Sequence, residues 1–304
     1  MHSLIREQLQ SFLYSYKKPT REEGLPVVYD AAEDHAERKQ IAYRDAVEKL
    51  EVAKRMKVGF AVRANRDYDG ALDRHSPLID KTISFHKSQF LHIHARYSPE
   101  WWIGRIVEKK GKMGFIPTAR RLGRMEKKIV DEDGGRIGPS SIWECPAPYT
   151  VVPSSRPVLF IGPAFHGSQK LQTDIGRKYL GRTDYEENEK ELKAITILAE
   201  DLKILLLEAP HINTPMDLKD IHLAPIIVQI RVSNRSVLMR LMNKTGIGAN
   251  NKKTELAGVD ALSGLSRDLV DVIIEEKGLA EATKRMCSYL EDYWAATHPQ
   301  WQEL

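Results

Sequence analysis

The pattern of apolar and polar positions in the first half of the chain predicts a helix followed by short strands. Residues 33–57 contain no Gly or Pro and place Ala46, Leu50 and Ala53 on one face, which predicts a solvated helix. From Val58 onward the chain reads as short β-type runs separated by polar or glycine-bearing turns, namely GFAVRAN, FLHIHARY, WWIGRIV and MGFIPT. Short runs of this kind are typical of a small antiparallel barrel.

The second half alternates continuous apolar runs with helical segments. Residues 124–147 come first, charged and then rich in Gly, Pro and Ser, and predict a linker. The apolar runs that follow are VLFIG, ILLLE, APIIVQIRV and VDVIIE. Between and after them we expect a helix through Tyr179, a charged helix over 184–203, and helices near 235–244 and 279–295. This alternation predicts a parallel α/β sheet covered on both faces, and so a multidomain fold of a β-barrel and an α/β domain.

Composition narrows the class of protein but identifies no partner. A formal charge of +4, from 46 basic and 42 acidic residues, is too mild to indicate nucleic-acid binding. Cys145 and Cys287 lie far apart without metal-ligand spacing, which fits a reducing compartment. No segment approaches the roughly 20 apolar residues that a bilayer requires, and the N-terminus lacks the apolar core of a signal peptide. We expect a cytoplasmic chain without a direct membrane span.

The stretch VLFIGPAFHGSQKL begins as a phosphate-binding loop but does not complete one. Gly162 and Gly167 have the required spacing, whereas Ser168 stands where a lysine should reach the outer phosphates. Phosphoryl transfer depends almost entirely on electrostatic stabilisation, so the missing lysine argues against catalysis. We therefore predict a degenerate phosphate loop, no catalytic residue and no cofactor, with an active guanylate kinase as the enzyme alternative.

Two residue pairs in the barrel region have both a functional and a structural interpretation. His92 and His94 lie two apart on a predicted strand and so share a face, as metal ligands do, but no third ligand with clear spacing follows. We predict a half-exposed strand face and no metal site. Trp101 and Trp102 must point to opposite faces of their strand. One of them could line a peptide groove, although packing of both against neighbouring elements is the favoured interpretation.

Several longer strings carry a resemblance to a known family. They are GFAVRAN, FLHI, WWIGR, GFIP, YTVVPSSRPVLFIGP, LAPIIVQI, VLMRL and YLEDYWAATHP. Together they closely resemble the auxiliary beta subunit of voltage-gated calcium channels, from about Ala32 to Pro299. That family belongs to the membrane-associated guanylate kinase group, whose fold joins an SH3 barrel through a variable linker to a guanylate-kinase-like domain without enzyme activity.

The resemblance implies a division of the chain in which PAPYTVVPS supplies the last barrel strand after the linker. The implied parts are an N-terminal segment and helix (1–57), an SH3-like barrel (58–123), a variable linker (124–145), the last SH3 strand (146–155), a guanylate-kinase-like domain (156–299) and a tail (300–304). The region near 180–197 is much shorter than in the family, and we expect it to lack a strand of the sheet. The chain is then a short splice form or a divergent member, or it is compromised there.

The resemblance also implies a partner. In this family the kinase-like domain holds an amphipathic helix from the pore-forming alpha-1 subunit, in the cytoplasmic linker between its first and second repeats, and the complex lies at the plasma membrane. The implied groove residues are Val237, Arg240 and Leu241 on one helix and Lys277, Leu279, Ala282 and Met286 at another. Lys277 replaces a family asparagine, and Thr245 replaces an arginine.

The alternative is a guanylate-kinase-type scaffold that binds other peptides through the barrel, although AVRANRDY replaces the aromatic pattern that builds a proline-rich-peptide groove.

Overall fold

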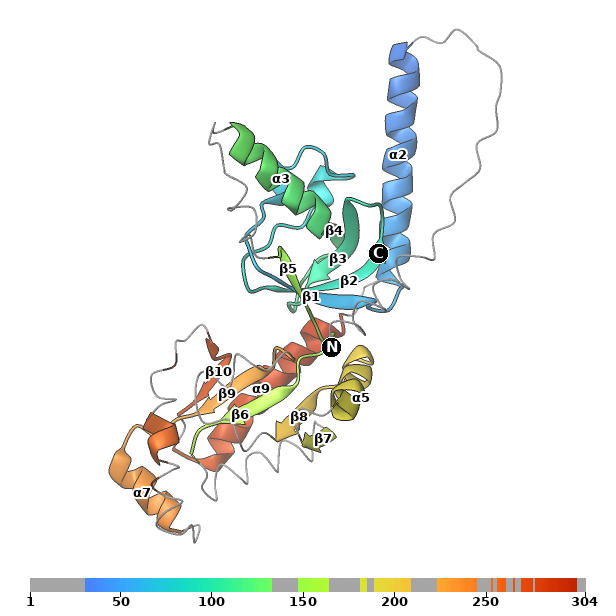
Figure 1. Cartoon of the computed structure of the whole chain (residues 1–304). Coiled ribbons are helices and arrows are strands. Elements are labelled where there is room, and N and C mark those ends of the chain that lie inside the picture. Colours follow the sequence, from blue (N-terminus) through green and yellow to red (C-terminus); the bar gives the residue numbers. More distant parts are fainter. Residues whose placement is uncertain are drawn as a thin grey trace.

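The computed structural model describes residues 31–132, 147–163, 181–184, 189–208, 223–244, 253, 256–260, 265, 269–275 and 277–299. Two five-stranded sheets organise these residues (Figure 1). The first is antiparallel, in the order β4-β3-β2-β1-β5, and the second is parallel, in the order β10-β9-β6-β8-β7. The predicted combination of a small antiparallel β sheet and a parallel α/β sheet is confirmed.

One edge strand of the antiparallel sheet comes after the expected linker in the sequence. Its strands are β1 (Phe60–Ala64), β2 (Phe90–Arg96), β3 (Trp101–Ile106), β4 (Gly114–Pro117) and β5 (Tyr149–Val152). β5 pairs with β1, with Ala61 opposite Val152. The barrel is therefore split in sequence, and only residues 153–157 separate its last strand from the first strand of the parallel sheet.

Apolar side chains cover both faces of the antiparallel sheet. One face forms the barrel core, where Trp102 meets Phe60 and Tyr149 at ring-centroid distances of 5.3 and 5.5 Å. The other face lies under helix α2 (Ala31–Lys54), which buries Ala46, Leu50 and Ala53 beside Trp101. The predicted helix and its contact face are thus confirmed. The two tryptophans point to opposite faces, where Trp101 is buried and Trp102 is half-buried against the barrel core.

Helix α3 (Ala119–Glu132) was not expected from the sequence. It occupies the first third of the segment that we assigned to the linker, and its residue Leu122 packs into the barrel core with Met125 beside it. Residues 124–132 of the expected linker are therefore helical, which the dense charges of ARRLGRMEKK conceal although Leu122 and Met125 pack on the barrel.

The parallel sheet has helices on both faces. Its strands are β6 (Val158–Ile161), β7 (Gly181–Asp184), β8 (Leu205–Glu208), β9 (Ile226–Ile230) and β10 (Val272–Ile274). Helix α9 (Leu279–Thr297) packs on one face, and helix α5 (Glu189–Glu200) packs on the other through Ile195. Helix α7 (Arg235–Asn243) follows β9 at one end of the sheet (Figure 1). The predicted helix through Tyr179 lies outside the described residues.

The region near 180–197, which we expected to lack a strand of the family's sheet, contains strand β7. β7 lies within it and pairs with β8 in parallel, with Gly181 opposite Leu205 and Asp184 opposite Glu208. A strand of four residues with the sequence GRTD has no apolar alternation, so its pattern is that of a loop. As the last strand of the sheet it has a single hydrogen-bonded neighbour, and an edge position does not require apolar side chains on both faces.

Candidate functional site

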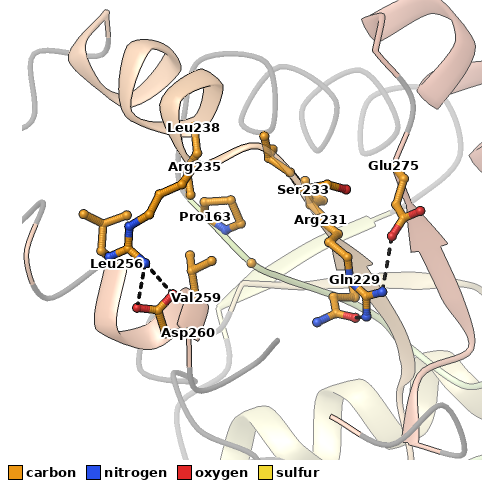
Figure 2. A pocket seen from close by; sticks show the side chains of 13 residues that line it. Pro163, Gln229, Arg231, Ser233, Arg235, Leu238, Leu256, Val259, Asp260 and Glu275 are labelled. Atoms are coloured by element: carbon orange, nitrogen blue, oxygen red, sulfur yellow. Dashed lines mark hydrogen bonds and ion pairs between the residues drawn. The ribbon is translucent and has the colours of Figure 1, made fainter. Parts of the chain in front are cut away.

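A pocket of about 380 Å³ opens at the carboxyl ends of three parallel strands. Its wall includes Gly162 and Pro163 after β6, residues 229–233 at the end of β9, and Glu275 after β10 (Figure 2). The wall is completed by Arg235 and Leu238 of α7 and by Leu256, Val259 and Asp260. In open α/β sheets, ligands bind outside the carboxyl ends of the strands, which makes this pocket the candidate site of the parallel domain.

Two ion pairs give the pocket its charge. Arg231 Nη1 lies 3.2 Å from Glu275 Oε1, and Arg231 Nη2 donates to Gln229 Oε1 at 2.9 Å. Across the pocket, Arg235 Nη1 lies 3.1 and 3.2 Å from the two carboxylate oxygens of Asp260 (Figure 2). The pocket therefore offers both signs of charge at its edge, with aliphatic side chains between them.

Gly162 begins the degenerate phosphate loop and has a structural requirement of its own. Its φ is +126°, and a Cβ atom there would lie 2.4 Å from the carbonyl oxygen of Ile230. Only glycine allows β6 and β9 to approach in this way. The other two residues assigned to the loop, Gly167 and Ser168, lie outside the described residues.

Helix α7 carries the first half of the predicted groove. Its buried side chains are Leu238 and Met242, whereas Val237 and Leu241 are half-buried one turn apart and Arg240 is exposed. Asn234 caps the helix by accepting from the backbone N–H groups of residues 236 and 237 at 2.9 and 3.1 Å. The helix thus offers a partly accessible apolar strip beside the pocket.

The second half of the predicted groove, at α9, is more deeply buried than the first half on α7. Ala282 and Met286 belong to the core between α9 and the sheet, and Met286 is completely buried. Leu279 is half-buried at the start of α9, and Lys277 is exposed just before it. A partner could touch Leu279 and Lys277 directly, but it could reach Met286 only if α9 moved away from the sheet.

The histidine pair of the barrel is buried, which corrects our expectation of a half-exposed face. His92 Nε2 lies 2.7 Å from the carbonyl oxygen of Ser154, and His94 Nδ1 lies 2.9 Å from that of Met56. Burial, together with the guanidinium of Arg105, lowers the pKa of His92 to about 3. Each ring thus bonds a different backbone segment. The described ranges hold no group of three or more His, Cys, Asp or Glu side chains placed to bind a metal ion.

The aromatic residues of the barrel serve its own packing. Tyr68 lies 5.2 Å from Phe85 between ring centroids and donates its hydroxyl to Asp73 at 3.0 Å. Arg121 of α3 donates from Nε to the same carboxylate at 2.9 Å and lies over the ring of Trp101. Helix α3 is therefore fixed to the barrel by the ion pair between Arg121 and Asp73 and by the contact of Arg121 with Trp101.

The charged residues of the pocket were not predicted from the sequence. Arg231 and Arg235 flank the turn after β9, whereas Asp260 and Glu275 come from two later segments, and no short motif joins the four. A usable signal was present, because two of them directly follow the apolar runs of β9 and β10. Side chains that follow neighbouring parallel strands meet at one edge of a sheet.

No protein-family model matches this chain. Among solved structures, the chain is similar to the SH3-kinase fragment of tight junction protein 3 in its apo form. The two are 16% identical, the match covers 78% of this chain and 96% of that chain, and the TM-score is 0.38. Among the helices that the structure describes, none has the length and apolar character needed to cross a membrane.

Proposed function

We propose that this chain is a non-catalytic regulatory subunit of a voltage-gated calcium channel, of the beta type. It binds the amphipathic helix in the cytoplasmic linker between the first and second repeats of the pore-forming alpha-1 subunit. Through that contact it resides at the plasma membrane, promotes surface delivery of the channel and modulates gating. The observation that carries the proposal is the set of long strings, from GFAVRAN to YLEDYWAATHP, that resemble this family.

The surface of the parallel domain supports a helix as the ligand. Val237 and Leu241 form a half-buried apolar strip on α7, and Leu279 and Lys277 add accessible positions at the start of α9. Amphipathic helices are recognised by apolar side chains that face a groove at the spacing of helical turns. An interface of this kind needs no catalytic group.

The phosphate loop supports the absence of catalysis. Ser168 replaces the lysine that stabilises the transferred phosphoryl group, and Gly162 is required by its close approach to Ile230 whether or not a nucleotide binds. The purified chain should transfer no phosphate from ATP to GMP in a coupled assay. Turnover that Gly167→Ala abolishes would mean that the domain is an active kinase.

The functional test is co-expression with a pore-forming subunit in cells that lack endogenous channel subunits. We expect larger surface currents with the chain than without it, and loss of the increase when the linker helix is interrupted by proline. If currents and surface labelling stay the same with and without the chain, the proposed channel role is wrong.

A further inference from the structure

Ser233 has an unusual position in the pocket. It is exposed, it belongs to the turn between β9 and α7 rather than to either element, and it contributes to the pocket wall. Arg231 and Arg235 each lie two residues away and line the same pocket. Figure 2 shows Ser233 beside Arg231, on the side of the pocket where Glu275 lies.

We propose that Ser233 is a phosphorylation site whose phosphate is held at the pocket by Arg231 and Arg235. Kinases select substrates partly by charge pattern, and a basic residue before the acceptor serine suits a kinase with an acidic substrate cleft. The kinase transfers the γ-phosphoryl group of ATP to Ser233 Oγ. The new O–P ester bond replaces the bond to the β-phosphate, the hydroxyl proton is released, and ADP leaves.

Arg231 is prepared to take a second anion. Its side chain lines the pocket, and its Glu275 partner is about half exposed. An exposed carboxylate pair contributes little, whereas a phosphoserine brings a charge of about −1.5 to −2 and three acceptor oxygens. The phosphate therefore displaces Glu275, which can turn to solvent.

Arg235 can respond in the same way. Its side chain and that of Asp260 are both more than half exposed, so their pair is also weak. Both carboxylates at the pocket would repel a phosphate if they stayed in place. Their exposure means that water can solvate each carboxylate when the phosphate takes its place beside the arginine.

The first experiment asks whether Ser233 is modified. The full chain is incubated with a basophilic kinase and ATP, and phosphorylated residues are located by mass spectrometry. Ser236 is the matched control, because it is exposed and follows Arg235 directly but lies inside α7. We expect phosphate on Ser233 and not on Ser236, and at least tenfold slower modification of Arg231→Gln. Modification of Ser236 alone, or of neither serine, would overturn the proposal.

The second experiment asks whether the pocket holds the phosphate. Phosphoserine is incorporated at position 233 during translation, and its titration is followed by phosphorus NMR in the folded and the urea-unfolded chain. Two nearby guanidinium groups should lower the second pKa of the phosphate, ordinarily about 6, by about 0.5 or more in the folded chain. Arg231→Gln should abolish most of this difference. Equal values in the folded and unfolded chain would contradict the assignment.

A regulatory consequence rests on the proposed function. A phosphate beside the strip of Val237 and Leu241 would have to lose water beneath a bound helix, which is unfavourable. We expect at least tenfold weaker binding of the linker-helix peptide to the phosphorylated chain. If the unmodified chain does not bind the peptide, the proposed function fails while the NMR result still decides the phosphate site. If both forms bind equally well, the regulatory consequence is wrong.

Discussion

His92 is a histidine that the folded protein keeps neutral. Burial is the main cause, and the Arg105 guanidinium opposite it on β3 adds to the effect, so that its pKa falls from 6.5 to about 3. An unfolded chain would bind a proton at this position below about pH 6.5, whereas the folded chain would not until about pH 3. The unfolded state thus binds more protons across this range, and stability falls as the pH falls.

We predict that His92→Gln reduces this acid sensitivity. The amide can still donate to the carbonyl of Ser154 but does not titrate. A tenfold change in proton affinity corresponds to about 1.4 kcal/mol, so His92 should account for a loss on the order of a few kcal/mol between about pH 6.5 and pH 4. The measurement is urea unfolding at several pH values, comparing slopes of stability against pH. His94 and His298, whose pKa values are also lowered by burial, contribute the same slope to both proteins. Identical slopes would show that His92 does not carry the effect.

Gly162 and Gly123 should differ in how strongly an alanine substitution changes the stability of the protein. Gly162→Ala places a methyl group against the Ile230 carbonyl in a backbone conformation that alanine avoids, and we expect a loss of about 2 kcal/mol or more. Gly123→Ala is the matched control, since it lies in α3 with nothing within 4 Å of its new Cβ and should be neutral or stabilising. Urea unfolding measures both. Equal changes in stability for the two substitutions would show that position 162 does not require glycine more than position 123 does.

Single residues were predictable from sequence only where a local pattern specified them. The glycine spacing of VLFIGPAFHG identified Gly162, and the alternation of WWIGRIV placed Trp101 and Trp102 on opposite faces. The burial of His92 was not predictable, because it depends on residue 154, which lies far along the chain.

Helices α7 and α9 contribute unequally to the proposed groove. Leu241→Ala and Leu279→Ala remove half-buried side chains, so the double variant should stay folded and bind the linker-helix peptide about 2 kcal/mol or more less tightly. Ile197→Ala is the matched control, because Ile197 is an exposed apolar residue on α5, outside the groove. Calorimetric titration compares the three proteins. A double variant that binds like the control would place the groove elsewhere.

Substitution of Met286 should change the stability of the protein, so it is not used to locate the groove. Because it is fully buried against the sheet, Met286→Ala should cost about 2–5 kcal/mol of stability through the cavity that it leaves. Weaker peptide binding by that variant would therefore not locate the groove.

Elements with a strong apolar period could be predicted, and those without one could not. The runs VLFIG and APIIVQIRV identified β6 and β9, and residues 279–295 identified α9 nearly to its end at Thr297. α3 is an exception: it has an apolar stripe that includes Leu122 and Met125, but the dense charges around these residues favoured a linker. β7 was missed because its sequence GRTD has no apolar alternation.

Arg156 connects the two sheets of the whole molecule. Its guanidinium pairs with Asp271 at 2.7 and 2.9 Å, donates to the carbonyls of Ala224 and Pro225, and lies over the ring of Phe90 in the barrel at 4.3 Å. Its backbone N–H donates to the hydroxyl of Tyr293 on α9. One residue between β5 and β6 therefore contacts the barrel, the edge of the parallel sheet and α9.

We predict that Arg156→Lys destabilises the protein by about 2–4 kcal/mol, because an ammonium cannot form these forked contacts. The control is Lys109→Ala, whose pair with Asp292 also joins the barrel to α9 but is exposed. It should leave stability unchanged. Thermal and urea unfolding provide the comparison. A mild Arg156→Lys variant would mean that the contacts of Arg156 do not hold the two sheets together.

We propose that the parallel domain binds the helix of a channel linker and does not act as a kinase. Calorimetric titration of the purified chain with a linker-helix peptide tests it most directly, beside the same peptide interrupted by proline. We predict saturable one-to-one binding of the helical peptide, no binding of the interrupted one, and a rise in melting temperature with peptide concentration, as expected for a ligand of the folded state. Absence of heat and of any change in melting temperature, in a chain that unfolds cooperatively, would contradict the proposed function.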